Sequence, residues 1–334
     1  MELAFTHTGQ PHRLPLGRDF AAPAGETYRD TPVATLRELI AQIEAGRPWR
    51  EAVAARYAQQ QSWLYRIITD PNRDLFFRQY PPAVGSRVLD IGAGWGQLAL
   101  PLARHCQVCA LEPTAERLDF IRAAAAQDGV SRALWFVQSD FLHIDFETRF
   151  DLVLCIGVLE WVPKFAPDLE PIEAQRRFLR RARAALAPGG RLVIGIENRL
   201  GLKYLLGAPD DHIGHAGVSI LPYKLADRRW RAISGQPLRA LTHTRADLDT
   251  LLAETGFGHR EFFGAFPDYK LPSAIVPLGQ ATEAHAASAF IPEHEGVTGA
   301  PLPNQAELQG LYQDLAHLGV ASAFVPSFMV AASD

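Results

Sequence analysis

From residue 87 onward, short apolar runs alternate with longer stretches that have helical periodicity. The run Phe150–Ile156 is apolar throughout, which is typical of a strand that is covered on both faces. The alternation predicts an α/β fold with a mostly parallel sheet and helices on both faces. The predicted strands are Arg87–Ile91, Gln107–Leu111, Leu134–Gln138, Phe150–Ile156, Arg191–Glu197, Arg260–Phe263 and Phe324–Ala331, the last of them antiparallel. The predicted helices are Gln97–His105, Ala115–Gln127, Gln175–Leu186, Thr242–Glu254 and Glu307–Leu318.

The first 80 residues have a different pattern. Residues 1–29 show no sustained period, so we expect an irregular arm there. Apolar residues at helical spacing then predict one helix over about residues 31–45 and a second over about residues 49–68. We therefore expect an N-terminal arm and helical lobe over residues 1–80 and a second domain over residues 81–334.

A glycine-rich turn follows the first predicted strand of the sheet. Asp90–Gly96 reads DIGAGWG, and the next strand ends at Glu112. Glycines in such a turn let the backbone bend tightly and leave room for a ligand at a helix N-terminus, which is typical of nucleotide binding. The spacing G-x-G-x-G differs from the G-x-G-x-x-G of dinucleotide sites. In addition, the carboxylate of Asp90 would repel a pyrophosphate but could hold an ammonium group.

These residues resemble motif I of the class I S-adenosylmethionine (SAM) methyltransferases, D/E-x-G-x-G-x-G, and Glu112 falls where that family places its ribose-binding acid. The turn Leu186–Leu192, LAPGGRL, is similar to the turn before the family's fifth strand. The resemblance implies a seven-stranded Rossmann-like sheet, SAM as the cofactor and methyl transfer as the reaction. It also implies that Asp90 holds the methionyl ammonium and that Glu112 accepts both ribose hydroxyls. The other cofactor contacts that it implies are Gly92, Ala93, Gly94, Gly96, Pro113, Asp140, Phe141, Ile156 and Gly157.

Composition narrows the range of partners. The 334-residue chain has a formal net charge of −4 and a pI near 6.3, so it lacks the basic character of a general nucleic-acid binder. No run approaches the ~18 apolar residues of a membrane span, and the N-terminus has no apolar signal region. The three cysteines are odd in number, and Cys106-x-x-Cys109 lacks the second pair of a zinc site, so we predict buried thiols. We therefore expect a cytoplasmic protein with a small-molecule partner, and neither a nucleic acid nor a membrane.

Beyond the fifth strand the sequence becomes more distinctive. Glu197–Tyr204, ENRLGLKY, and Pro267–Pro272, PDYKLP, resemble a bacterial subgroup that is encoded with glycosyltransferases. That resemblance implies a small acceptor with hydroxyl groups: a sugar, a glycan terminus or a secondary metabolite. We also predict insertions at about residues 198–241 and 265–323; within the second, residues 277–305 are expected to be a long loop or partly helical.

Methyl transfer to a hydroxyl needs a group that takes the hydroxyl proton. Ligands of open α/β sheets bind at the carboxyl ends of the strands, so this base is expected in the loops after the fourth and fifth strands. His212 is the predicted base because imidazole titrates near neutral pH and flanking carboxylates would orient it, although a surface histidine among acids is the alternative. The predicted catalytic residues are His212, Glu197 and Asp211, and the predicted acceptor contacts are Asn198, Tyr204, His215, Asp268 and Tyr269.

A metal site is not expected from the sequence. The acids and histidines between Asp210 and His215 lie too close together on one loop to complete a coordination set. N- or C-methylation of a small metabolite, a SAM-binding scaffold without methyl transfer, and a homodimer remain alternatives.

Overall fold

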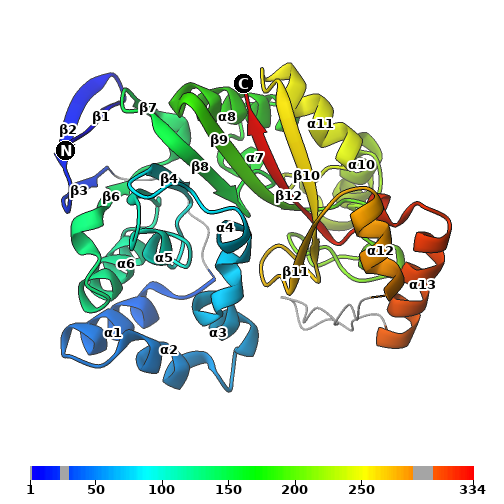
Figure 1. Cartoon of the computed structure of the whole chain (residues 1–334), viewed down its shortest axis with the longest axis horizontal. Helices are drawn as coiled ribbons and strands as arrows, with labels where there is room; N and C mark the ends of the chain where they lie inside the picture. The colour runs from blue at the N-terminus through cyan, green and yellow to red at the C-terminus, as the bar shows by residue number, and fades with distance from the viewer. Residues whose placement is uncertain (1, 23–29, 289–303) are drawn as a thin grey trace. The chain divides into compact units, whose positions relative to one another are not determined.

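The chain divides into two compact units in the computed structural model, which describes residues 2–22, 30–288 and 304–334 (Figure 1). Unit 1 comprises Met1–Ile156 and Arg180–Val193, and unit 2 comprises Gly157–Leu179 and Ile194–Asp334. Strand β9 (Leu186–Glu197) contributes residues to both. No helix among the described residues combines the length and the apolar character that a membrane span requires.

The sheet of unit 1 is built on the predicted parallel strands. Its order is β9-β8-β4-β5-β6-β3, and β5 and β8 flank β4 in parallel register. Val88, Leu89 and Val108 are fully buried, as expected for central strands that are covered on both faces. The α/β prediction is confirmed, and four strands have the bounds predicted for them: β4 (Arg87–Ile91), β5 (Gln107–Leu111), β6 (Leu134–Gln138) and β8 (Phe150–Ile156).

Helices α5 and α6 belong to the same unit. Helix α6 (Ala115–Gln127) has the predicted bounds. Helix α5 covers only Ala99–Leu102 of the longer predicted helix. Helix α8 (Pro171–Ala185) contributes its last residues to this unit. Two short 3-10 helices complete it, η2 (Ser131–Ala133) and η3 (Phe141–His143).

The helical lobe of unit 1 packs against α6. The backbone N–H of Trp49 donates to Gln127 Oε1 at 2.8 Å, and the Trp49 ring meets the Phe120 ring edge-on. One predicted helix is wrong: instead of a continuous helix over residues 49–68, two helices form. Residues 58–61 include no buried side chain, so nothing holds a helical turn there. The lobe contains α1 (Val33–Glu44), α2 (Trp49–Tyr57), α3 (Ser62–Thr69), η1 (Pro71–Asp74) and α4 (Leu75–Gln79).

The irregular arm predicted for residues 1–29 is also wrong where the structure describes it. Strands β1 (Glu2–His7) and β2 (Gln10–Pro15) form an antiparallel hairpin, and β7 (Ile144–Phe146) pairs with β1. Strand β3 (Asp19–Ala21) pairs with β6, more than 100 residues away. These partners are distant in sequence, so a local hydrophobic period does not reveal them.

Unit 2 adds an antiparallel region to the fold. Its strand order is β11-β10-β12-β9, and β10 and β12 are antiparallel with Phe263 opposite Met329. The prediction that the last strand is antiparallel is therefore confirmed. Among the described residues, the sheet has nine strands instead of the seven expected, because β3 and β11 are added to it. The strands of this unit are β10 (His259–Phe266), β11 (Ala274–Pro277) and β12 (Ser327–Ser333).

The helices of unit 2 include one inside the expected insertion at residues 277–305. Helix α12 (Gln280–Ser288) begins shortly after β11, whereas residues 289–303 of that stretch lie outside the described residues. Helix α11 (Arg245–Glu254) begins three residues later than predicted, and Thr244 caps it by accepting from the N–H of Asp247. The remaining helices are α7 (Val162–Phe165), α9 (Leu202–Leu205), α10 (Tyr223–Ser234), α13 (Gln305–His317) and η4 (Ala321–Ala323).

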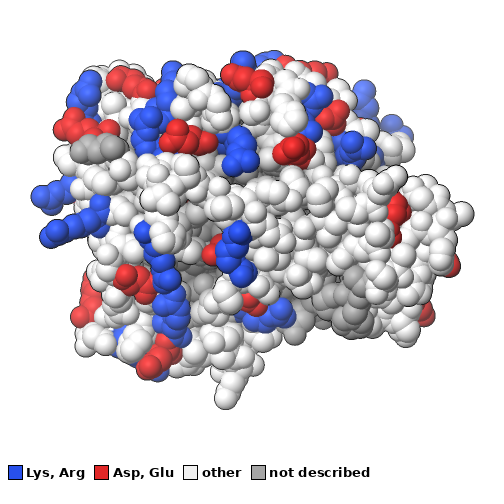
Figure 2. Space-filling model, viewed as in Figure 1, with Lys and Arg blue, Asp and Glu red and all other residues white. Residues whose placement is uncertain are grey.

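The surface carries charges of both signs, and the cysteines are buried. On the face that Figure 2 draws, Lys and Arg side chains are mixed with Asp and Glu, and α12 and α13 contain neither Lys nor Arg. This mixture differs from the continuous basic stripe that binds a phosphate backbone. Cys106, Cys109 and Cys155 are buried free thiols, as predicted.

Candidate active site

The glycine turn after β4 positions the carboxylate of Glu112. Gly92, Gly94 and Gly96 have φ values of 70°, 57° and 77°, a region that favours glycine. The N–H of Gly94 donates to Glu112 Oε2 at 3.0 Å, and the N–H of Thr114 donates to Glu112 Oε1 at 3.0 Å. Backbone groups therefore fix this buried carboxylate. Each carboxylate oxygen keeps a second lone pair that can accept a ligand hydroxyl.

Asp90, near the end of β4, has a carboxylate oxygen without a partner. The residue is 3% exposed, and its Oδ2 has no hydrogen-bond partner among the described residues. Burial raises the pKa of Asp90 to about 7, although the Arg73 guanidinium opposes the shift. A buried oxygen of this kind is costly unless a ligand satisfies it. The methionyl ammonium of SAM would do so, and Asp90 therefore fits the implied cofactor.

The other residues implied for the cofactor lie in the turns that follow the strands. Asp140 Oδ1 accepts from the N–H of Leu142 at 2.8 Å, which starts η3 directly after β6. Gly157 follows β8 with φ of 73°, and a Cβ there would lie 2.8 Å from the Tyr269 hydroxyl, so only glycine fits without a shift. The remaining members are Ala93 after β4, Pro113 after β5, Phe141 after β6 and Ile156 at the end of β8.

Trp95 anchors the glycine turn to the helical lobe. Its side chain is 2% exposed and packs edge-on against the rings of Phe120 and Tyr57. The indole N–H donates to Asp30 Oδ2 at 3.3 Å, and Asp30 Oδ1 is 2.7 Å from the Arg117 guanidinium. The shape of the turn thus depends on the lobe as well as on its glycines.

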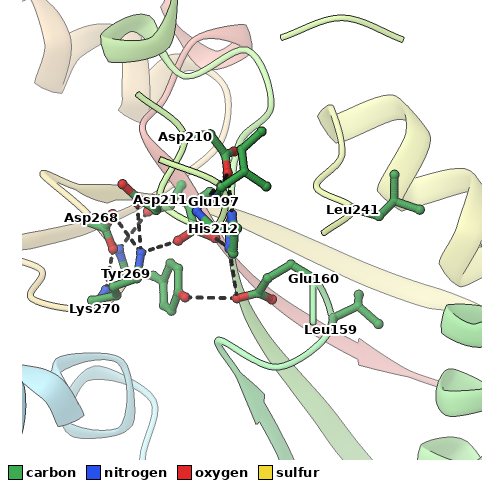
Figure 3. Close-up of polar contacts among 12 residues, drawn as sticks. Leu159, Glu160, Glu197, Asp210, Asp211, His212, Leu241, Asp268, Tyr269 and Lys270 are labelled. Atoms are coloured by element: carbon green, nitrogen blue, oxygen red, sulfur yellow. Dashed lines mark hydrogen bonds and ion pairs between the residues drawn. The ribbon is translucent and has the colours of Figure 1, made fainter. Parts of the chain in front are cut away.

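Unit 2 gathers a second group of polar side chains, drawn in Figure 3. Glu160 follows β8 by four residues, and Glu197 is the last residue of β9. The side chains of both glutamates are at most 1% exposed. The loop after α9 and the segment after β10 supply the other members, Asp210, Asp211, His212, Asp268, Tyr269 and Lys270.

Two lysine ammonium groups neutralise part of this group. Lys270 Nζ contacts Glu197 Oε1 and lies 3.1 Å from Asp211 Oδ2. Lys203 Nζ lies 3.0 Å from the same Asp211 oxygen, and both ammonium groups are within 3.8 Å of Asp268 Oδ2. Burial lowers the pKa of Lys270, but the Asp268 and Glu197 carboxylates outweigh burial and raise it well above its ordinary value. The two lysines are therefore integral to the charge balance of the site.

His212 lies among three carboxylates. Its Nε2 is 3.5 Å from Glu197 Oε2 and 3.8 Å from Glu160 Oε1, and its Nδ1 is 3.3 Å from Asp210 Oδ1. Asp210 Oδ1 also accepts from the backbone N–H of His212, which shapes the loop. Burial lowers the pKa of His212, but the Glu197 and Asp210 carboxylates outweigh it and raise the pKa well above its ordinary value. The imidazole therefore holds a proton at neutral pH.

The two glutamates beside His212 have different electrostatic surroundings. Burial raises the pKa of Glu160, whose Oε1 accepts from the Tyr269 hydroxyl at 3.3 Å. Burial also raises the pKa of Glu197, but the Lys270 ammonium and the His212 imidazole outweigh it, so this pKa is lowered. The pKa of Glu160 is therefore shifted toward neutral pH, whereas Glu197 stays ionised.

Two predicted acceptor contacts have other partners. The Asn198 amide donates to the carbonyls of Ala323 and Val325 at 2.9 and 2.8 Å, and its Oδ1 accepts from the N–H of Leu200. The imidazole of His215 lies 2.9 Å from the Ala216 carbonyl. Tyr204, in contrast, reaches the charged group, since its hydroxyl is 3.4 Å from Asp211 Oδ2.

Four residues of the charged group are absent from the predicted catalytic and acceptor residues: Glu160, Asp210, Lys203 and Lys270. Glu160, Asp210 and Lys203 complete the surroundings of His212 and Asp211. Glu160 offered a signal, because it follows the fourth predicted strand within a few residues. There was no such signal for Lys203, which is a single charged residue in a short helix.

The similarity to known proteins covers the glycine turn and the strands around it. Residues 89–194 match a family model described as a methyltransferase domain. This segment is therefore a methyltransferase domain. The methyltransferase domain includes the glycine turn, Glu112 and Glu160, whereas Glu197, His212 and Lys270 lie beyond the matched residues.

Among the relatives of the methyltransferase domain are enzymes with different acceptors. The chain is 31% identical to the ubiquinone biosynthesis O-methyltransferase of Methylocella silvestris over 180 residues, which are 51% of this chain and 64% of that protein. It is 35% identical to the tRNA 5-carboxymethoxyuridine methyltransferase of Escherichia coli over 119 residues, 35% of this chain and 42% of that protein. The matches thus span about two fifths to just under two thirds of these relatives.

Solved methyltransferase structures also resemble the chain. The phosphoethanolamine N-methyltransferase 2 of Haemonchus contortus in complex with SAM has a TM-score of 0.45 at 16% identity, with 89% of this chain and 60% of that one covered. The CcbJ methyltransferase of Streptomyces caelestis has a TM-score of 0.43 at 20% identity, with 61% and 83% covered.

Proposed function

We propose that this chain transfers the methyl group of SAM to a hydroxyl of a small polar acceptor, such as a sugar, a glycan terminus or a secondary metabolite. The buried charged group carries the proposal, because its carboxylates and imidazole follow β8 and β9, where ligands of α/β sheets bind. A polar acceptor could satisfy such groups, whereas an apolar one would leave them without partners.

Residues of unit 1 would hold the cofactor. Asp90 would bind the methionyl ammonium through Oδ2, and Glu112 would accept the ribose hydroxyls through its remaining lone pairs. The bound sulfonium supplies an electrophilic methyl group with a good leaving group. Alignment of the acceptor oxygen with that methyl group is then the main task of the protein.

A hydroxyl acceptor must also lose its proton. The predicted base, His212, holds a proton at neutral pH, so we assign proton acceptance to Glu160. A catalytic base works best when its pKa lies near the operating pH, and burial shifts the pKa of Glu160 in that direction. His212 and Glu197 would then orient the acceptor and balance charge, while Asp211 positions the two lysines.

The first test is calorimetric titration of the purified chain with SAM and with S-adenosylhomocysteine, with NAD as the control ligand. Binding of SAM but not NAD, weakened in Glu112→Ala, is the expected result. Incubation with SAM and a panel of sugars, polyols and phenols should then give S-adenosylhomocysteine and a methyl ether, both detected by mass spectrometry. Methylation of amines alone would overturn the hydroxyl assignment, and SAM binding without transfer to any acceptor would favour the scaffold alternative.

A further inference from the structure

We propose that Glu160, Glu197 and His212 form a binding site for a divalent transition-metal ion of the Zn²⁺ or Mn²⁺ kind. Each residue offers one ligand atom, and these atoms all lie within 4.8 Å of one another. The three side chains are at most 2% exposed.

The spacing of the three side chains matches ligands of one ion. His212 Nε2 lies 3.5 Å from Glu197 Oε2 and 3.8 Å from Glu160 Oε1. These separations are long for hydrogen bonds. Two atoms that are each about 2.1 Å from a metal ion at a tetrahedral angle lie ~3.4 Å apart, which is close to both values.

Two carboxylate oxygens at this position have no partner. Glu160 Oε2 and Glu197 Oε2 are buried without a hydrogen-bond partner among the described residues. A buried carboxylate oxygen that is left unsatisfied costs free energy, whereas a bound cation would satisfy it. This observation points to a ligand independently of the ligand spacing.

The surroundings of His212 would orient it as a metal ligand. Asp210 Oδ1 lies 3.3 Å from Nδ1, the ring nitrogen opposite the proposed ligand atom, and it accepts from the backbone N–H of His212 and of Ile213. Metal-binding histidines commonly have a carboxylate on their other nitrogen, which fixes the ring orientation. Asp210 is in position for this role, and binding of the ion at Nε2 would displace the proton that this nitrogen holds in the metal-free protein.

A neighbouring set of carboxylates is already neutralised by lysine side chains. Glu197, Asp211 and Asp268 also bring three oxygens within 4.8 Å, but the ammonium groups of Lys203 and Lys270 lie among them. In the first set, the ammonium of Lys270 contacts Oε1 of Glu197, whereas the proposed ligand oxygen, Oε2, faces His212.

The ligand types narrow the choice of metal. An imidazole with two carboxylates suits Zn²⁺ or Mn²⁺ better than Mg²⁺, which prefers oxygen ligands alone. Three protein ligands leave a fourth position open, as in catalytic zinc sites. That position could take a hydroxyl oxygen of the acceptor. In that case the ion would lower the pKa of the hydroxyl, and Glu160 would act as a ligand of the ion instead of as a free proton acceptor. This role rests on the proposed methyl transfer, whereas the metal site does not.

The test uses the full chain without SAM or acceptor, so that a failure of methyl transfer cannot affect it. Chelator-treated protein is titrated calorimetrically with ZnCl₂ and MnCl₂, and one bound ion is expected. Because removal even of an outer partner commonly costs about 10-fold or more in metal affinity, Glu160→Gln and His212→Gln should each weaken binding by at least about 10-fold. The control is Glu254→Gln, a surface residue paired with Arg176, which should leave the affinity within about 3-fold, the scatter expected for a residue that is not a ligand.

A second measurement covers the case in which the ligand variants do not fold. The unaltered protein is titrated with CoCl₂, and the visible absorption of a four- or five-coordinate cobalt site is expected in place of the weak spectrum of the hexaaqua ion. Thermal unfolding of each variant shows whether it is folded. The proposal is overturned if the unaltered protein binds none of the three ions, or if folded Glu160→Gln binds as tightly as Glu254→Gln.

Discussion

The glycine turn of unit 1 and the charged group of unit 2 position carboxylates in opposite ways. Glu112 accepts from the backbone N–H groups of Gly94 and Thr114, which lie 18 and 2 residues from it in the sequence. Glu197, in contrast, is held by side chains, Lys270 and His212, that come from distant loops. Where backbone groups hold the carboxylate, a single side-chain substitution should weaken ligand binding but leave the fold intact. Where oppositely charged side chains hold one another, a single substitution should lower either the catalytic rate or the stability of the protein.

The largest expected effect is on turnover. Glu160→Gln removes the assigned proton acceptor, so kcat should fall by about 10²- to 10⁴-fold, the range typical of general base catalysis. The affinity for SAM should stay unchanged, because Glu160 is not among the residues expected to contact the cofactor. Formation of S-adenosylhomocysteine measures the first quantity and calorimetry the second.

Glu254→Gln is the control for this variant, since Glu254 pairs with Arg176 at the surface. A turnover in Glu160→Gln equal to that of Glu254→Gln would remove Glu160 from the mechanism.

The next effect is on stability. Lys270→Met leaves Glu197, Asp211 and Asp268 as buried carboxylates without that ammonium, so the free energy of unfolding should fall by about 3–5 kcal/mol. Denaturant unfolding measures the change. The exposed pair Arg78–Asp74 provides the comparison, since Arg78→Met should cost at most about 1 kcal/mol. Equal losses in the two variants would show that the buried charges do not depend on Lys270.

A smaller effect is expected at the glycine turn. Glu112→Ala removes the acceptor of the Gly94 and Thr114 N–H groups and of the ribose hydroxyls, so SAM binding should weaken by about 1–3 kcal/mol. Calorimetric titration measures the loss. Glu112→Gln retains one acceptor oxygen and should lose less. If both variants bind SAM as the unaltered protein does, Glu112 is not a cofactor ligand.

The smallest effect is a pH dependence of SAM binding. Because the pKa of Asp90 is raised to about 7, its carboxyl group is neutral below that pH and ionised above it. The methionyl ammonium needs the ionised form, so SAM affinity should fall by up to about 10-fold for each pH unit below 7. Titrations at a series of pH values measure this slope. Asp90→Asn should bind more weakly and show a flatter profile; an unchanged profile would assign the titration to another group.

Residues that act through local backbone geometry were predictable. The bounds of β4, β5, β6, β8 and α6 follow from apolar runs and their ends, and the spacing of Asp90–Gly96 and Glu112 indicates a cofactor turn by itself. Glu197 and His212 were predicted because loops after strands carry ligands in α/β folds. The pairing of Phe20 with Val137 was not predicted, because a register between distant segments leaves no local period.

The sequence by itself therefore determined the α/β class, the cofactor turn and the loops that carry the candidate chemistry, because each depends on neighbours within a few residues or one helical turn. Only the tertiary structure decided the charge state of those loops. It placed Asp210 and Glu197 beside His212, which makes the predicted base an imidazolium, and two lysines among Asp211 and Asp268. The pKa of a buried group depends on which charges lie within a few ångströms, and that distance is set by packing between segments far apart in the chain.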